Sequence, residues 1–174
     1  LDLDYTRISG TIPPELGGCT SIYELDLDNS LISGTLPPTI GLFTSLFDLE
    51  LHNSRLSGTL PPEMASMRRL TFAQLHDTRI SGTIPETFDD VGTWNHLERI
   101  RLSRLPLSGT LPQKFFRRMR DLEVFDVADT RLSGTLPRTL DDAVDLEVLD
   151  IRETHISGTL PHDLAERLDK LFKI

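Results

Sequence analysis

The sequence contains a single cysteine, Cys19, among 174 residues, so no disulfide can form within it. No apolar run reaches the roughly 18 residues that a membrane-spanning helix requires. Hydrophobic residues make up only 38% of the chain, which is low for a compact globule and ordinary for a thin, elongated protein. Basic residues are outnumbered by acidic ones, and the net charge of −9 makes nucleic acid an unfavourable partner. These absences favour an extended protein with a large polar surface.

An internal repeat dominates the sequence. The string Ser-Gly-Thr-(Ile/Leu)-Pro occurs seven times, beginning at Ser9, Ser33, Ser57, Ser81, Ser108, Ser133 and Ser157. The intervals are 24, 24, 24, 27, 25 and 24 residues, and a period of this kind indicates stacked, similar units. In one register the units are 1–24, 25–48, 49–72, 73–99, 100–124, 125–148 and 149–173, and Ile174 opens an eighth. A residue's position is its place within its own unit, so Leu1 and Leu25 both stand at position 1.

Each unit has the pattern of a strand, a turn and a helical segment. Positions 1 and 3 are apolar in nearly every unit, which is typical of a strand with one face turned inward. Positions 8 and 12 are always Ile or Leu, and we expect both to point into the core. Ser-Gly between them predicts a turn, and the proline at position 13 predicts the start of a helical segment. Apolar residues then follow about three apart, such as Ile40, Phe43 and Leu46, which suits a 3₁₀ or irregular helix.

One unit cannot bury these apolar side chains alone, whereas stacked units bury them against one another. Stacking would place the strands side by side, about 4.8 Å apart, in a parallel sheet. We therefore predict a single α/β solenoid domain. It should be a right-handed superhelix with a parallel sheet on its concave side and 3₁₀ or irregular segments on its convex side.

The pattern L-x-L-x-x-x-x-(I/L)-S-G-T-(I/L)-P resembles the plant-specific class of leucine-rich repeats, seen in receptor ectodomains and polygalacturonase inhibitors. That class normally has Asn at position 6, where its amide bonds the backbone of the next unit. Here position 6 is Ser or Thr in six units and Leu105 in the fifth. A hydroxyl can do a weaker version of that task, but leucine cannot. We therefore expect unit 5 to be locally irregular.

Hydroxyl residues at position 6 also make the repeats similar to those of kinetoplastid surface antigens, the promastigote surface antigen and proteophosphoglycan group. The most similar stretch is residues 57–67, SGTLPPEMASM. The units differ from one another more than the near-identical repeats of that group do. The resemblance implies a surface-exposed or secreted antigen, often lipid-anchored, that binds host or environmental molecules. Both families flank the repeats with cysteine-containing caps, so we expect this fragment, whose caps are missing, to belong to a longer chain.

Positions 2, 4 and 5 are expected to face the concave surface, with position 7 at its border. The candidate partner-binding residues at positions 2, 4 and 5 are Asp2, Asp4, Tyr5, Asp26, Asp28, Asn29, Glu50, His52, Asn53, His76, Asp77, Arg101, Arg104, Asp126, Asp129, Arg152 and Glu153. Position 7 adds a row of arginines, Arg7, Arg55, Arg79 and Arg131.

Charge varies along the chain. Residues 1–50 contain eight acidic residues and one basic residue, whereas residues 99–120, the basic band, contain seven basic residues and none that is acidic. The acidic columns would suit a partner with a cationic patch, and the basic band is the other possible binding surface. The alternative is that these charges only keep a repeat array soluble.

His52 and His76 stand at position 4 of adjacent units, so we expect their side chains to be neighbours. With Glu50 and Asp77 close by, they could hold a divalent metal. Two solvated histidines, which would titrate at about pH 6, are the simpler interpretation. We therefore predict no metal site and no cofactor.

Two other side chains are expected in the core. Cys19 is equivalent to Phe43 and Met67, which predicts a buried, inert thiol. Three extra residues in unit 4 put Trp94 in a convex bulge, where we expect it to fill the core; an exposed tryptophan would instead be a plausible anchor for a partner.

The sequence favours binding over catalysis. No Ser-His-Asp order, glycine-rich phosphate loop or paired carboxylate stands out from the repeat, so we do not expect an enzyme. We expect an extracellular or cell-surface module that binds a protein on its concave face, possesses no nucleic-acid partner and contacts a membrane only through an anchor outside this fragment. One alternative is a structural surface-coat or self-assembling scaffold component.

A second alternative is ice or polysaccharide binding through a threonine ladder at position 11, formed by Thr11, Thr35, Thr59, Thr83, Thr110, Thr135 and Thr159. Against it, we expect these threonines to lie in a turn, with their hydroxyls bonded to local backbone groups. The intervals of 27 and 25 residues should also break the spacing that a lattice would require.

Overall fold

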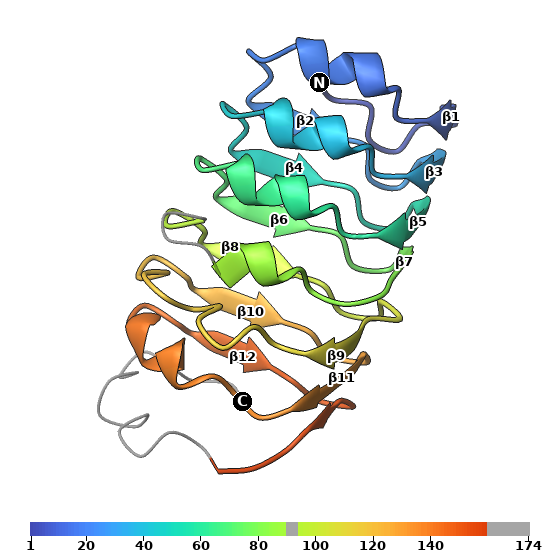
Figure 1. The fold of residues 1–174 in the computed structure, drawn as a ribbon. Helices are drawn as coiled ribbons and strands as arrows, with labels where there is room; N and C mark the ends of the chain where they lie inside the picture. The colour runs from blue at the N-terminus through green and yellow to red at the C-terminus, as the bar shows by residue number, and fades with distance from the viewer. Residues whose placement is uncertain (90–93, 160–174) are drawn as a thin grey trace.

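The computed structural model describes residues 1–89 and 94–159, which form a stack of similar units (Figure 1). One face is a parallel sheet of six strands in the order β12-β10-β8-β6-β4-β2, the concave sheet. Its strands are β2 (Glu24–Asp26), β4 (Asp48–Glu50), β6 (Phe72–Gln74), β8 (Arg99–Arg101), β10 (Val124–Asp126) and β12 (Val148–Asp150). The predicted leucine-rich-repeat solenoid, with its parallel concave sheet, is confirmed.

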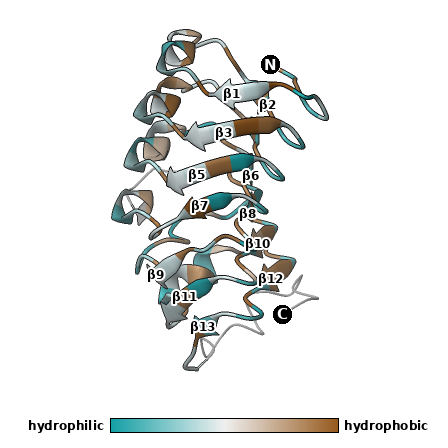
Figure 2. Cartoon of the chain, turned by 90° about the vertical axis from the view of Figure 1, so that its right-hand side faces the viewer, coloured by the Kyte–Doolittle hydropathy of each residue, from teal (hydrophilic) through white to brown (hydrophobic). Residues whose placement is uncertain are grey.

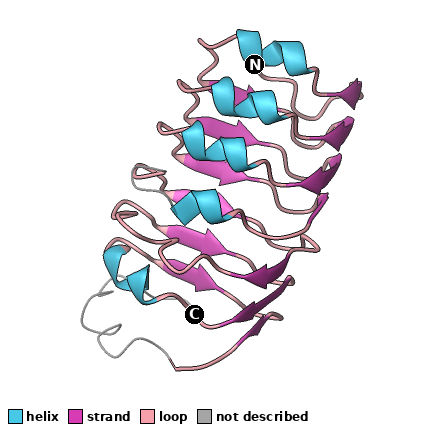
Figure 3. Ribbon diagram, in the orientation of Figure 1, coloured by secondary structure: helices cyan, strands magenta, loops and turns pink. Residues whose placement is uncertain are grey.

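Short 3₁₀ helices cover the side opposite the concave sheet (Figure 3). They are η1 (Pro14–Gly18), η2 (Pro38–Leu42), η3 (Pro62–Ser66), η4 (Glu86–Asp89) and η5 (Arg138–Asp142). The proline at position 13 precedes η1, η2, η3 and η5 in an extended conformation, with φ between −71 and −61°. The predicted helical segment after this proline is therefore confirmed in those four units.

A second set of strands runs along the side of the stack, where the sequence predicted only turns (Figure 2). We call it the second sheet; it consists of β1 (Ser9–Thr11), β3 (Leu31–Thr35), β5 (Arg55–Thr59), β7 (Arg79–Ser81), β9 (Ser108–Thr110), β11 (Arg131–Gly134) and β13 (His155–Ile156). Thr11, Thr35, Thr59 and Thr110 of the threonine ladder lie in these strands, so for them the predicted place in a turn is wrong. Thr83, Thr135 and Thr159 lie outside the strands. Stacking brings the same extended segment of neighbouring units together, and their backbone N–H and C=O groups pair.

Position 7 also belongs to the second sheet and not to the border of the concave sheet. Arg55, Arg79 and Arg131 are the first residues of β5, β7 and β11. Side chains alternate along a strand, so positions 7, 9 and 11 face outward while the residues at position 8 are buried from the second unit to the sixth.

The glycine of each Ser-Gly-Thr string is required by its backbone and by its neighbour. Gly58 has a φ of +84°, a conformation that side chains rarely adopt. A Cβ atom there would lie 2.7 Å from Cγ2 of Thr35 in the preceding unit. The threonine methyl thus packs in the space that the absent side chain leaves, and this contact recurs along the stack.

Unit 5 is irregular, as predicted, but the cause differs from the one expected. The second sheet divides between β7 and β9, where only an isolated bridge joins Gly82 to Leu107. In units 2 and 6 the position-7 N–H donates to the position-8 carbonyl of the preceding unit, as Leu31 does to Ile8. Pro106 occupies position 7 of unit 5 and has no N–H to donate, so the ladder is interrupted there.

The hydroxyls at position 6 act within their own unit, and the expected bond to the next unit is wrong. Ser30 donates to the Leu27 carbonyl at 2.6 Å and Thr130 to the Val127 carbonyl at 2.8 Å. Each of these bonds closes a turn, and the residue just before the hydroxyl residue, at position 5, has a positive φ. Leu105 makes no such bond, but it is buried, and Arg104 before it keeps a φ of 59°.

Core packing confirms the place of Trp94 and corrects that of Cys19. Trp94 is 1% exposed, packs against Phe88 with ring centroids 4.2 Å apart and the rings tilted by 50°, and donates from Nε1 to the Met64 carbonyl at 3.2 Å. The thiol of Cys19 is exposed, contrary to the prediction. The equivalent Phe43 and Met67 are buried.

Candidate functional site

The strands of the concave sheet present one more outward column than the sequence analysis identified. Each strand starts one residue before position 1, so that residue faces outward together with position 2. The missed column is Glu24, Asp48, Phe72, Arg99, Val124 and Val148. Side chains alternate along a strand, so a buried residue at position 1 implies an outward residue on each side of it. This signal in the sequence could have revealed the missed column.

Position 5 lies beyond the strands, in a turn at the edge of the concave sheet. All seven residues there have positive φ, between 47 and 59°: Tyr5, Asn29, Asn53, Asp77, Arg104, Asp129 and Glu153. They therefore lie at the edge of the concave sheet and not within its strands, and Tyr5, Asn53, Arg104, Asp129 and Glu153 are exposed there.

Among the predicted residues at positions 2 and 4, Asp2 and Arg152 are exposed, while Asp4, Asp26, Glu50, His52, His76, Arg101 and Asp126 are half-buried. Asp28 is only 3% exposed, so it is a supporting residue and not an open contact. Its carboxylate accepts a hydrogen bond from the Asn29 amide and pairs with His52 Nε2 at 3.2 Å.

The first units gather acidic groups that hold protons unusually well. Burial, a hydrogen bond with Asp28 and the charges of Asp28 and Glu50 raise the pKa of Asp26 to about 7. Burial and the charges of Glu50 and Glu24 raise the pKa of Asp48 to about 6. Several carboxyl groups therefore lie in this part of the concave sheet. Units 1 and 2 contain a single basic residue, Arg7, so few positive charges offset them.

His52 and His76 are neighbours, as predicted. Their rings stack with centroids 4.5 Å apart and an interplanar angle of 25°. Burial and the charge of His76 lower the pKa of His52, while His76 Nδ1 contacts Asp77 Oδ2 at 2.8 Å. Lone pairs lie in the ring planes, so two nearly parallel, stacked imidazoles do not converge on one metal ion.

A different donor set could hold a cation. Asp28, Glu50 and His52 have ligand atoms within 4.8 Å of one another. However, Asp28 already engages His52 and Asn29, and Glu50 accepts a hydrogen bond from Gln74 at 2.6 Å. These internal bonds account for the cluster without a metal.

The raised pKa of Asp26 predicts that stability falls as the pH rises. The unfolded carboxyl, with a pKa near 3.8, loses its proton at pH values where the folded one keeps it, until the pH exceeds about 7. Because solvent screens this half-buried group, we expect thermal or urea unfolding to show a loss of about 1–2 kcal/mol between about pH 4 and about pH 7. Asp26→Asn should flatten this dependence, whereas the exposed control Asp129→Asn should keep it. An unchanged slope in Asp26→Asn would contradict the assignment.

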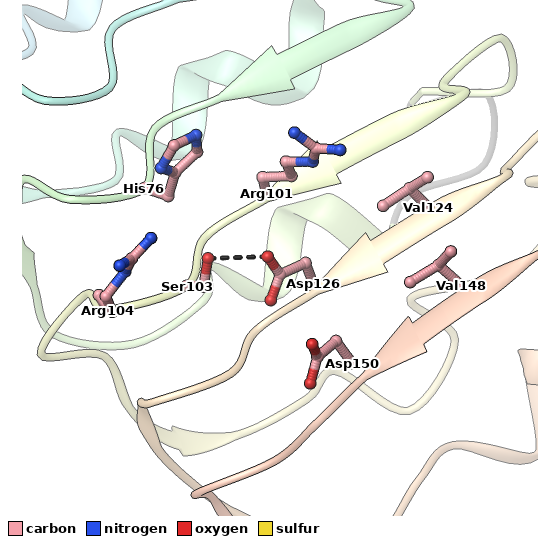
Figure 4. Close-up of a pocket in the computed structure, with 8 residues that line it drawn as sticks. All are labelled: His76, Arg101, Ser103, Arg104, Val124, Asp126, Val148 and Asp150. Atoms are coloured by element: carbon pink, nitrogen blue, oxygen red, sulfur yellow. Dashed lines mark hydrogen bonds between the residues drawn. The ribbon is translucent and has the colours of Figure 1, made fainter. Parts of the chain in front are cut away.

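The second feature of the concave sheet is a hollow of about 260 Å³ in the units that carry the basic band (Figure 4). Its lining residues are His76, Arg101, Ser103, Arg104, Val124, Asp126, Val148 and Asp150. Val124 and Val148, from the missed column, form an apolar side, and the polar residues lie further along the strands (Figure 4).

Most charges around the hollow are already engaged. Asp126 accepts hydrogen bonds from the Ser103 hydroxyl at 2.8 Å and from the Ala128 N–H at 3.0 Å. Arg152 binds both oxygens of Asp150, at 2.8 and 2.6 Å. Arg104 pairs with Asp77 at 2.9 Å.

Arg101 differs from these neighbours. It is half-buried, it lies beside Asp126 across the strands, and yet it has no acidic partner among the described residues. Elsewhere in the basic band, Arg99 pairs with Glu123 at 3.3 Å and lies over the Phe72 ring. The guanidinium of Arg101 is therefore the cation that the concave sheet leaves available to a ligand.

Comparisons with known proteins agree with this architecture. The leucine-rich-repeat family model matches residues 1–19 and 145–166. A solved plant peptide hormone receptor, RGFR1 in complex with RGF2, has a TM-score of 0.91 and 29% identity, over 98% of this chain and 27% of that one. The ectodomain of GASSHO1/SCHENGEN3 from Arabidopsis thaliana, solved with CASPARIAN STRIP INTEGRITY FACTOR 2, has a TM-score of 0.88 and 25% identity, over 99% of this chain and 23% of that one.

A plant ice-binding protein shares the fold, with a TM-score of 0.80 and 21% identity, over 100% of this chain and 63% of that one. No curated protein sequence matches the chain. The resemblance to kinetoplastid surface antigens is not supported.

The chain spans about a quarter of the length of the two receptor ectodomains, at 27% and 23%. Among the described residues, no helix is both long and apolar enough to cross a membrane. The stacked parallel strands and the solved structures of similar fold show that the chain is a leucine-rich-repeat solenoid, and the family model matches two stretches of it.

Proposed function

We propose that this chain is an extracellular or cell-surface recognition module that binds a polypeptide partner along its concave sheet and performs no catalysis. An acidic group of the partner would pair with Arg101, and an adjacent apolar side chain would pack on Val124 and Val148. Basic residues of the same partner would lie along the acidic first units.

The observation that carries the proposal is the half-buried guanidinium of Arg101, without an acidic partner and beside an apolar wall. A charge-assisted hydrogen bond to a carboxylate is stronger there than on an open surface, because part of the water is already excluded. The hollow is shallow and lies among columns of polar side chains. This arrangement suits an extended peptide segment better than a compact small molecule.

The structural comparisons support the same class of function. The two receptor ectodomains with similar folds were solved with a peptide hormone and with an integrity factor. An extracellular or cell-surface location follows as part of the proposal, because those ectodomains belong to plant membrane receptors.

Peptide selection tests the site directly. A displayed library of random peptides, selected on the immobilised chain, should yield sequences with an acidic residue next to an apolar one. Arg101→Gln should weaken their binding about tenfold to a hundredfold, since a hydrogen bond to a charged group is lost. Arg117→Gln, an exposed arginine of the same basic band, is the matched control and should bind like the unmodified chain. Equal affinities for Arg101→Gln and the unmodified chain would remove Arg101 from the site.

Two alternative functions, a self-assembling coat and binding through the threonine ladder, rest on different observations. The described residues supply no specific observation for a self-assembling coat, and light scattering would detect such assembly. The threonine ladder has a specific observation in its favour, because its threonines are exposed and four of them, Thr11, Thr35, Thr59 and Thr110, lie in strands of the second sheet.

A further inference from the structure

The second sheet carries a repeating set of hydrogen-bonding groups on its outward face (Figure 2). Its strands pair with a stagger, so that Thr11 lies opposite Ser33, and Ser33 lies opposite Arg55. The next row is Thr35, Ser57 and Arg79. Each row thus places a threonine, a serine and an arginine side by side across three strands.

The rows continue past the interruption at Pro106. Ser108 lies opposite Arg131, and Thr110, Ser133 and His155 form a further row with histidine in place of arginine. Adjacent strands of a sheet are about 4.8 Å apart, so the rows repeat at a regular interval along the stack.

The hydroxyls in these rows are held in uniform orientations. Ser33, Ser57 and Ser81 donate to the glycine carbonyls of the preceding units, at 3.1, 3.2 and 3.1 Å. Their oxygen lone pairs therefore remain free to accept hydrogen bonds.

The threonines are fixed by their methyl groups. The methyls of Thr35 and Thr59 pack against the backbones of Gly58 and Gly82. Among the described residues, the hydroxyls of Thr35 and Thr59 have no hydrogen-bond partner, and both side chains are exposed.

The arginines of these rows stand out in an acidic protein. Arg55, Arg79 and Arg131 are exposed, and none of them has an acidic partner within the part of the chain that the structure describes. The net charge is −9, so acidic side chains are plentiful elsewhere on the molecule. The second sheet is a locally cationic and hydroxyl-rich surface, separate from the concave sheet.

We propose that the second sheet binds an extended acidic polysaccharide. Carboxylates spaced along the polymer would pair with Arg55, Arg79 and Arg131, and sugar hydroxyls would bond the serine and threonine hydroxyls between them. A polymer of like sugar units offers its groups at regular intervals, as the rows do.

Two other ligands fit the surface less well. Ice is a neutral lattice, and charged guanidinium groups beside the threonines keep their own hydration shells. An acidic peptide would have apolar side chains to bury, yet the outward residues at positions 7, 9 and 11 are polar apart from Leu31 and Pro106.

Calorimetric titration with oligogalacturonate of defined length tests the proposal. We expect binding that weakens with salt and that falls about tenfold when Arg55, Arg79 and Arg131 are all replaced by glutamine. The matched control replaces Arg68, Arg69 and Arg117, which are exposed outside the second sheet, and makes the same change in net charge. It should bind like the unmodified chain.

A second variant separates hydroxyl recognition from general charge attraction. Thr35→Val and Thr59→Val together keep the methyl contacts with the next glycines but remove both hydroxyls, so the fold should be retained. Binding of oligogalacturonate should weaken severalfold, because two hydrogen bonds at an exposed surface are lost.

Four results would overturn the proposal. They are absence of binding at low salt, equal losses in the arginine variant and its control, tighter binding of polyglutamate than of oligogalacturonate, and inhibition of ice recrystallisation without polymer binding. Peptides selected on the concave sheet should bind the arginine variant normally, so the outcome here is independent of the function proposed above.

Discussion

Replacing Trp94 by alanine should lower the free energy of unfolding by about 3–5 kcal/mol, the range for deleting a large buried aromatic ring. The side chain is 1% exposed and packs on Phe88 in the unit that carries three extra residues. It also donates a hydrogen bond to the Met64 carbonyl, which would be left without that donor. Unit 4 lies in the middle of the stack, so a loss there weakens the coupling of the units on both sides.

Urea unfolding followed by circular dichroism measures this effect, because Trp94 is the only tryptophan and its fluorescence is lost with it. Trp94→Phe should recover most of the stability and lack about 1 kcal/mol for the missing N–H donor. Tyr23→Ala removes an exposed aromatic, 63% accessible, and should change stability by about 0.5 kcal/mol or less. A Trp94→Ala protein as stable as the Tyr23→Ala protein would show that the bulge is not part of the core.

Replacing Gly58 by alanine should destabilise the protein by about 2–4 kcal/mol. Two costs combine: a side chain at a φ of +84°, and a Cβ atom 2.7 Å from Cγ2 of Thr35. The double variant Gly58→Ala/Thr35→Ser removes the opposing methyl, so it should recover the steric part of the loss and retain the backbone part.

Gly18 offers the matched control for this experiment. A Cβ atom there meets nothing within 4 Å, and its φ lies outside the strained positive range. Gly18→Ala should therefore leave the urea midpoint nearly unchanged. If Gly58→Ala is equally silent, or if Thr35→Ser recovers nothing in the double variant, the packing of threonine methyl on glycine does not stabilise the stack as described.

The sequence alone was enough for the repeat, the solenoid, the concave sheet and the 3₁₀ segments. These follow from short-range pattern: alternating apolar residues define a strand, and proline at position 13 defines where a helical turn begins. Burial of position 8 in units 2 to 6, of position 12 in units 1 to 5 and of Trp94 also followed, because one unit can cover its apolar residues only by stacking on the next.

The tertiary structure decided what depends on how units lie against one another. Ser-Gly-Thr has turn composition, yet it forms a second sheet because neighbouring units supply backbone partners that no single unit contains. Cys19 is exposed, although Phe43 and Met67 at the same position of the next units are buried. The start of the strands, one residue early, places Val124 and Val148 beside Arg101. Whether a charge is free or paired, as with Arg101 and Arg104, depends on distances across strands, and no spacing along the chain encodes them.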